Sequence, residues 1–353
     1  MSNLTDIALC KALEGSGEEL SRISFYCVRR RGHLLLALPA DREAALATLK
    51  LYQPQVFMGK VVAVVVGLMV RVGLHRLLPS KSLKVQMGGP LAVLVNDLSR
   101  AGFLLGNPDA ESRRALVVHH QADGYVVDKV GVDKKSRQSV IAELEVIKML
   151  PDMLTGTPDL YGNQLEDTWA SYTTGFVEGS SPSKDDDELV IGILGDWMKN
   201  ARCVSLCETG QWQEMADSVS GHEVGEIWTR LEKASSLSVK VGVFHGDFAP
   251  WNIKLSNDGG VTVLDWETGC NEGPTGWDWL HYMIQRAILV DEISVNEALD
   301  SCHTWAETEK GKQFLDSAGW GRNVELWIGS YLAYSSWIAG FDRKELLTAW
   351  MGE

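Results

Sequence analysis

Short apolar runs bounded by turn residues predict strands at several places along the chain. Residues 25–28 and 34–38 flank the turn Arg29-Arg30-Arg31-Gly32 and predict a hairpin. Residues 102–106, 114–119 and 125–131 predict further strands, and residues 239–244 predict a buried strand that runs into His245-Gly246-Asp247. Helices are predicted at residues 41–52, with Asp41 as the cap, at 136–150, at 185–198 and through most of the chain after 278. The mixture of elements predicts an α+β protein.

A helix predicted from about residue 54 to 78 contains the most apolar stretch of the chain. Its central run, residues 61–70, lies between Lys60 and Arg71. A membrane-spanning helix needs about twenty apolar residues, so we expect no transmembrane segment here. Two interpretations remain: a helix packed on the protein body, which we favour, or a basic amphipathic helix that contacts a membrane surface. Residues 80–90 are predicted to form a linker.

Composition indicates a globular protein of about two domains in 353 residues. Six scattered cysteines without a C-x-x-C pair favour reduced thiols and a cytoplasmic location, and no secretory signal is predicted. Residues 1–88 carry 12 Lys and Arg against 6 Asp and Glu, whereas the remainder carries 21 against 41. This acidic remainder argues against a nucleic-acid ligand and would suit a cationic acceptor, although acidic surfaces more often confer solubility alone.

Candidate chemistry is concentrated between residues 243 and 267. Asn257-Asp258-Gly259-Gly260 is typical of a hairpin loop, and symmetric closure would pair residue 256 with residue 261. Asn252 would then lie directly opposite Asp265, with Cβ atoms about 5 Å apart. An amide oxygen and a carboxylate at that separation can share one Mg²⁺ ion, which prefers a few hard oxygen ligands plus substrate phosphates.

Asp247 lies five residues before Asn252, which is the Asp-to-Asn spacing of kinase catalytic loops, although Gly246 stands where protein kinases have arginine. His-Gly-Asp-x-x-x-x-Asn followed by Leu-Asp-Trp-Glu resembles the aminoglycoside phosphotransferase and choline kinase family. That resemblance implies a two-lobed, protein-kinase-like fold with the nucleotide in the cleft. A small β-rich lobe would comprise residues 98–178 and a larger helical lobe residues 179–353. Residues 1–97 would form a basic extension packed on this kinase unit.

The resemblance also implies roles for individual residues. Asp247 would be the catalytic base, Asn252 and Asp265 the Mg²⁺ ligands, and Asp278 a brace for the catalytic loop. Lys129 would position the phosphates. Its partner is predicted to be Glu143 rather than Glu145, because Glu143 is a lone carboxylate in an apolar helix stripe. The remaining candidates are Gly106 in the loop over the phosphates, the backbone from Thr173 to Phe176 at the adenine, Trp251 toward the acceptor, and Glu267 near the metal.

The function implied by this resemblance is phosphorylation of a small-molecule hydroxyl, of aminoglycoside, sugar or amino-alcohol type, by ATP or alternatively GTP with Mg²⁺. One alternative is a kinase acting on a peptide or protein hydroxyl. Another is a nucleotide-binding pseudoenzyme whose basic N-terminal region docks a partner or a membrane. The complete set of Lys129, Glu143, Asp247, Asn252 and Asp265 argues against the pseudoenzyme.

Overall fold

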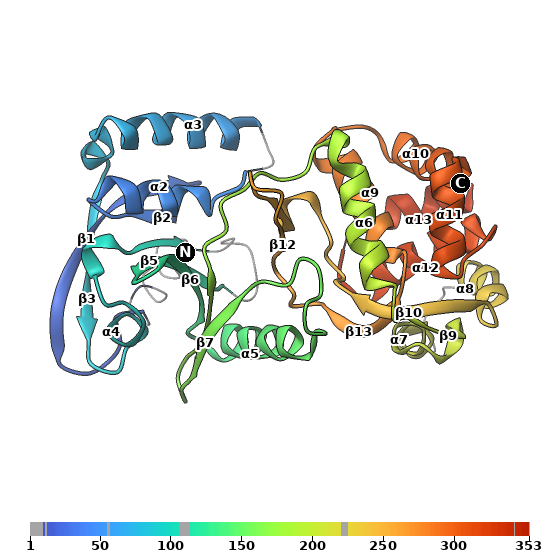
Figure 1. Cartoon of the computed structure of the whole chain (residues 1–353), viewed down its shortest axis with the longest axis horizontal. Coiled ribbons are helices and arrows are strands. Elements are labelled where there is room, and N and C mark those ends of the chain that lie inside the picture. The colour runs from blue at the N-terminus through green and yellow to red at the C-terminus, as the bar shows by residue number, and fades with distance from the viewer. Residues whose placement is uncertain are drawn as a thin grey trace. The chain divides into compact units, whose positions relative to one another are not determined.

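The chain folds into two compact units in a computed structural model that describes residues 10, 13–54, 57–105, 113–219, 225–341 and 343–352. The first unit comprises Met1–Glu145 and Pro158–Glu178, and the second comprises Val146–Thr157 and Gly179–Glu353 (Figure 1). The first unit is rich in strands and the second is largely helical, so the predicted α+β class is confirmed.

The first unit is built on one eight-stranded antiparallel sheet in the order β3-β1-β2-β4-β5-β6-β8-β7. The N-terminal segment contributes three of these strands, and the predicted hairpin at residues 25–38 is confirmed. The predicted linker at 80–90 is wrong, because Leu83 and Val85 alternate with exposed residues and form a strand paired with β1. The strands are β1 (Glu19–Arg30), β2 (His33–Leu38), β3 (Ser80–Gln86), β4 (Gly102–Leu105), β5 (Ala115–Gln121), β6 (Gly124–Gly131), β7 (Leu160–Leu165) and β8 (Ala170–Gly175).

Both faces of this sheet carry apolar clusters. Phe25, Phe103 and Val117 lie in a cluster that includes residues of α4 (Pro90–Leu94). The opposite face is covered by α2 (Arg42–Lys50), whose first turn is capped by the Asp41 carboxylate as predicted. Helix α3 (Phe57–Arg71) packs against α2, and α5 (Lys134–Met149) follows β6. This packing leaves one face of α3 exposed.

The second unit has an aromatic core, because five of its tryptophans are at most 1% exposed: Trp266, Trp277, Trp279, Trp320 and Trp327. A three-stranded sheet, in the order β13-β10-β9, and the hairpin β11-β12 carry the catalytic-loop segment. The strands are β9 (Arg202–Ser205), β10 (Ser238–Phe244), β11 (Ile253–Leu255), β12 (Val261–Val263) and β13 (Cys270–Pro274). The helices are α6 (Asp187–Trp197), α7 (Gly210–Val219), α8 (Gly225–Leu231), α9 (Trp277–Leu289), α10 (Val295–Glu307), α11 (Glu309–Ala318), α12 (Val324–Trp337) and α13 (Lys344–Met351).

Among the described residues, no helix combines the length and the apolarity that crossing a bilayer demands.

Candidate active site

The segment His245-Gly246-Asp247 leaves the end of β10 and is held there by Asp278 of α9. The Asp278 carboxylate accepts hydrogen bonds from His245 N (2.8 Å) and Gly246 N (2.9 Å), so it braces the loop. Burial raises the pKa of Asp278 to about 7, and these two N–H donors oppose that rise by stabilising the carboxylate. Gly246 has a φ of +80°, and a Cβ there would lie 2.8 Å from Thr268 Oγ1. The local backbone therefore requires glycine at the position where the protein-kinase pattern has arginine.

His245 connects this loop to the following hairpin. Its ring is fully buried, and Nε2 lies 2.9 Å from the carbonyl oxygen of Leu264. The other ring nitrogen, Nδ1, accepts the N–H of Asp247 at 3.2 Å. Burial lowers the pKa of His245 to about 4, so the ring is neutral near pH 7, with the proton on Nε2. The backbone of Asp247 is thus anchored through this imidazole to Leu264, directly after β12.

Asp247 has one hydrogen-bond partner at each carboxylate oxygen. Oδ1 lies 2.9 Å from His281 Nε2, and Oδ2 lies 3.1 Å from Asn252 Nδ2. Asn252 Nδ2 also donates to the backbone oxygen of Asp247 at 2.8 Å. The Asp247 side chain is still 24% exposed, so it is oriented and remains accessible.

His281 was not predicted from the sequence. It lies on α9, buried, and its Nδ1 is 2.9 Å from the hydroxyl of Tyr331 on α12. An ionised carboxylate only accepts hydrogen bonds, so donation to Asp247 places the proton on His281 Nε2 and leaves Nδ1 to accept from Tyr331. The side-chain amide of Gln285 lies 3.1 Å from the same Nε2, so in this tautomer Gln285 can only accept there, through its amide oxygen. Burial lowers the pKa of His281, which favours this neutral form, although its hydrogen bond to Asp247 acts in the opposite direction. The available sequence signal was its spacing three residues after Asp278 on one helix, which places both on one face.

The predicted register of the β11-β12 hairpin is wrong by one residue. The pairs are Leu255 with Val261 and Ile253 with Val263, and Ser256 N donates to Gly260 O at 2.9 Å. A loop with Gly259 at φ +87° replaces the expected symmetric closure, as in three-residue hairpins that have glycine in the left-handed position. Asn252 therefore faces Leu264, whose N–H donates to Asn252 O at 2.7 Å.

Asp265 follows Leu264 just beyond the end of β12, with a φ of +68°. A non-glycine residue in this left-handed region is uncommon, and such positions concentrate at functional sites. Side chains alternate between the two faces only in a regular strand, and Asp265 lies outside such a strand. The register shift of one residue therefore does not by itself place Asp265 and Asn252 on opposite faces. The next residue, Trp266, is fully buried and donates from Nε1 to Val263 O at 2.9 Å, which fixes the turn.

The donor set of this hairpin suits a hard cation. Because Asn252 Nδ2 donates to Asp247, its amide oxygen is the atom that can ligate a metal. No group of three or more His, Cys, Asp or Glu residues that could hold a metal occurs in the part of the chain that the structure describes. One amide oxygen and the Asp265 carboxylate fit Mg²⁺, which commonly takes one or two carboxylates and completes its shell with water and phosphate oxygens.

Lys129 and Glu143 form the predicted pair in the first unit. Lys129 Nζ on β6 lies 2.5 Å from Glu143 Oε2 on α5, and Glu143 is fully buried, whereas Glu145 is exposed. A buried carboxylate needs such a partner. Their role toward phosphates stays a prediction.

The structure shows which hydrogen-bonding groups of the predicted adenine-binding segment are already used. Thr173 lies in β8, and its hydroxyl donates to the buried Asp128 at 2.5 Å. Gly175 N donates to Asp159 O at 3.3 Å, and Phe176 N donates to Tyr125 O at 3.2 Å. These two N–H groups are therefore engaged within the first unit. Gly106 lies outside the described residues.

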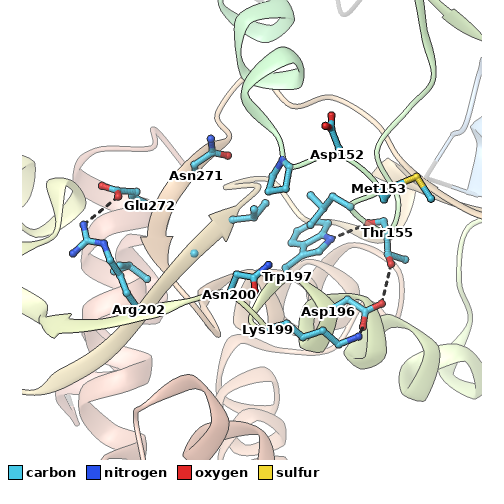
Figure 2. A pocket seen from close by; sticks show the side chains of 15 residues that line it. Asp152, Met153, Thr155, Asp196, Trp197, Lys199, Asn200, Arg202, Asn271 and Glu272 are labelled. Carbon is cyan, nitrogen blue, oxygen red and sulfur yellow. Dashed lines mark hydrogen bonds and ion pairs between the residues drawn. The ribbon is translucent and has the colours of Figure 1, made fainter.

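Trp251 is half-buried beside Asn252, and Glu267 is exposed. The second unit contains a cavity of about 390 Å³. Its lining includes neither Trp251 and Glu267 nor the loop and hairpin residues Asp247, Asn252 and Asp265. Figure 2 shows two ion pairs among the charged side chains that line this cavity. Asp196 contacts Thr155 and Lys199, and Arg202 contacts Glu272. The cavity is thus separate from the catalytic-loop residues.

The sequence matches no protein-family model and no curated protein sequence. Among solved structures, it is similar to a thermostable mutant of aminoglycoside phosphotransferase APH(4)-Ia in ternary complex with ADP and hygromycin B (12% identity, TM-score 0.45, covering 73% of this chain and 92% of that chain). It is also similar to a Plasmodium vivax ethanolamine kinase (11% identity, TM-score 0.40, covering 75% and 85%). A third similar structure is choline kinase LicA from Streptococcus pneumoniae (13% identity, TM-score 0.39, covering 67% and 86%).

These proteins bear names of the family that the catalytic-loop motif resembles. With TM-scores below 0.5, the similarities carry no functional argument, because one fold serves many functions. The functional conclusion depends on the residues of this chain.

Proposed function

We propose that the protein is a phosphotransferase that moves the γ-phosphoryl group of ATP, or alternatively GTP, to a hydroxyl group of a small molecule. The observation that carries this proposal is the geometry of Asp247. Its backbone is anchored by the Asp278-braced loop, and its two oxygens are held by His281 and Asn252 while the side chain stays accessible. A carboxylate oriented in this way suits the positioning of an attacking hydroxyl.

In the proposed reaction, the acceptor hydroxyl oxygen forms a bond to the γ-phosphorus, and its proton passes to Asp247. The bond from that phosphorus to the β–γ bridging oxygen breaks, and the nucleoside diphosphate leaves. Asn252 and Asp265 would hold Mg²⁺, which when bound neutralises charge on the phosphate oxygens. Lys129, held by Glu143, would position the phosphates. Gly106 and the carbonyl oxygen of Phe176 are further candidate contacts to the nucleotide, whereas Thr173 is paired with a neighbouring strand on each side. Exposed Glu267 is a candidate for contact with metal-bound water.

The acceptor class follows from the surroundings of the catalytic loop. Trp251 adjoins Asn252 and is half-buried, so its ring can offer an apolar face to a sugar ring or a cation. Three of the four acidic residues at 185–188 are already engaged, so recognition of a cationic amino group would depend mainly on Trp251. The Asp186 carboxylate accepts hydrogen bonds from the backbone N–H and the hydroxyl of Ser183, each at 2.7 Å. Asp187 pairs with Arg286, and Glu188 pairs with Lys310. We therefore propose a sugar, aminoglycoside or amino-alcohol acceptor that is recognised close to Asp247.

A direct test incubates the full chain with Mg-ATP or Mg-GTP and panels of aminoglycosides, sugars, amino alcohols and hydroxyl-bearing peptides. Mass spectrometry then detects a phosphorylated product. We expect one small-molecule class to gain a phosphoryl group with wild-type protein and not with Asp247→Asn. Phosphorylation of peptides alone would overturn the small-molecule assignment. Nucleotide binding without transfer to any panel member would favour the pseudoenzyme alternative.

A further inference from the structure

One face of α3 is apolar and exposed, and this face is independent of the catalytic residues. The outer face, as we call it, consists of Met58, Val61, Val64, Val65 and Leu68 of α3 and of Val72 directly after it. These side chains are between 38% and 67% exposed. By contrast, Val66 and Val70 are at most 6% exposed and belong to the cluster that α2 and β2 share. Positions 61, 64, 65, 68 and 72 follow helical spacing and share the side opposite Val66 and Val70. Figure 1 shows α3 on the outer side of α2 within the first unit.

The charged residues of α3 itself are both positive. Lys60 and Arg71 are exposed and lie along one border of the outer face, and no carboxylate of the described residues pairs with either. In the sequence, no Asp or Glu occurs between Glu43 and Asp97, although the same stretch contains six Lys and Arg residues. An exposed apolar face bordered by unpaired cations combines the two features that bind interfacial helices to anionic bilayers.

We infer that the outer face of α3 docks the protein on an anionic lipid surface, with its apolar side chains in the headgroup region and Lys60 and Arg71 at the lipid phosphates. The helix has 15 residues, fewer than the roughly twenty that spanning requires, so it would lie in the plane of the interface. The formal charge of −14 for the whole chain opposes this approach. Charges farther away than about 10 Å are, however, largely screened at 0.1 M salt.

Charge also disfavours a second copy of the chain as the occupant. An antiparallel contact between two outer faces, centred between Val65 and Val66, would place Lys60 of each copy near Arg71 of the other. The two pairs of like charges would be close together, and α3 contains no carboxylate to compensate them. An anionic bilayer supplies the compensating charge.

The test is flotation of the full-length protein with vesicles of phosphatidylcholine alone and of phosphatidylcholine with about one-third phosphatidylglycerol. We expect binding chiefly to the anionic vesicles. Val64→Gln combined with Leu68→Gln should weaken that binding about tenfold or more, since burial of each side chain contributes to it. Lys60→Gln combined with Arg71→Gln should remove the preference for anionic lipid.

A matched control is Val93→Gln combined with Leu165→Gln, which alters two apolar residues that are 46% and 49% exposed elsewhere in the first unit. Binding by this control should equal that of wild type, and all variants should keep the wild-type melting temperature. Absence of binding to anionic vesicles, or equal binding by every variant, would overturn the inference. A wild-type dimer that only the Val64/Leu68 variant converts to monomer would instead assign the face to a second copy. None of these results depends on phosphotransfer.

Discussion

Asp247 is restrained at each carboxylate oxygen by a partner from a different element. Asn252 comes from the catalytic loop itself, whereas His281 comes from α9 and is oriented in turn by Tyr331 of α12. Because His281 is buried and donates through Nε2, it fixes the plane of the carboxylate. We assign His281 as a positioning residue for Asp247.

Replacing His281 with Phe should keep the volume of the side chain and remove its hydrogen bond to Asp247. We expect the turnover number to fall roughly 10- to 100-fold, as small losses of alignment do, with the KM for nucleotide unchanged. His281→Gln, whose Nε2 can donate, should recover part of the rate. Steady-state kinetics with a verified acceptor distinguishes positioning from a structural role. Equal losses in both variants, matched by equal falls in melting temperature, would contradict the assignment.

His245 contributes a pH-dependent term to stability. Burial depresses its pKa from 6.5 to about 4, so the unfolded chain takes up a proton near pH 6.5 and the folded chain only near pH 4. Its contribution is therefore fully present above about pH 7 and is lost as the pH falls from 6.5 to 4. Asp278 acts in the opposite direction, because its raised pKa favours the folded state below about pH 4 and loses that effect as the pH rises through about 7.

Comparing wild type with His245→Gln isolates the contribution of His245 to the pH dependence of stability, since Asp278 is present in both proteins. The difference in their unfolding free energies should shrink by about 3 kcal/mol between pH 7 and pH 4, from the shift of the His245 pKa. Denaturant titrations at half-unit pH intervals measure this difference. A difference that stays constant with pH would show that His245 is not held in its neutral form.

At the scale of elements, the β11-β12 hairpin shows why the sequence indicates a candidate ligand pair but predicts the wrong strand register. Two consecutive glycines, Gly259 and Gly260, permit more than one loop closure, and the register depends on which of them adopts positive φ. The sequence was sufficient to indicate Asn252 and Asp265 as candidates. The left-handed backbone at Asp265 could not be predicted, because the long-range packing of Trp266 fixes it.

Asn252→Ala and Asp265→Ala should each weaken Mg²⁺-dependent nucleotide binding while Mg²⁺-independent binding remains. The physical reason is the loss of one of two oxygen ligands from a site that has few protein ligands. Calorimetric titration of nucleotide with and without Mg²⁺ measures the difference, and Asn257→Ala in the same hairpin is the control. An unchanged Mg²⁺ dependence in both variants would reject the paired-ligand assignment.

Helix α9 shows a second limit of sequence analysis. Asp278 was predicted as the loop brace because it lies in a recognisable segment, and its two hydrogen bonds confirm this. His281 follows one turn later, but in the sequence it resembles any polar residue within an apolar helix. Its contact with Asp247 joins residues 34 positions apart, which helical periodicity does not report.

Lys129 and Glu143 could be paired in advance because a lone acid in an apolar stripe requires a local partner.

At the scale of the whole molecule, the N-terminal segment is part of the sheet of the first unit. β2 pairs with β4 through Leu36–Leu104 and Ala37–Phe103, and Phe25 contacts Phe103 edge to face. The sequence predicted the hairpin and the capped helix of this segment. It did not predict the shared sheet, since pairing between strands nearly seventy residues apart leaves no local pattern.

Deletion of residues 1–97 should leave β4 as an unpaired edge and uncover Phe103 and Val117. We expect aggregation, or a melting temperature lower by at least about 10 °C. Scanning calorimetry and gel filtration of the truncated chain test this expectation. A monomeric truncated chain with the wild-type melting temperature would show that the segment contributes nothing to stability.

The central claim is that Asp247 supports transfer of a phosphoryl group to a hydroxyl, and single-turnover transfer by Asp247→Asn tests it most directly. The asparagine keeps the shape of the side chain and can still be held by its neighbours, so nucleotide affinity should equal that of wild type. Loss of the base should slow transfer by at least about 10²-fold. A variant that binds nucleotide normally and transfers at a rate close to that of wild type would contradict the account.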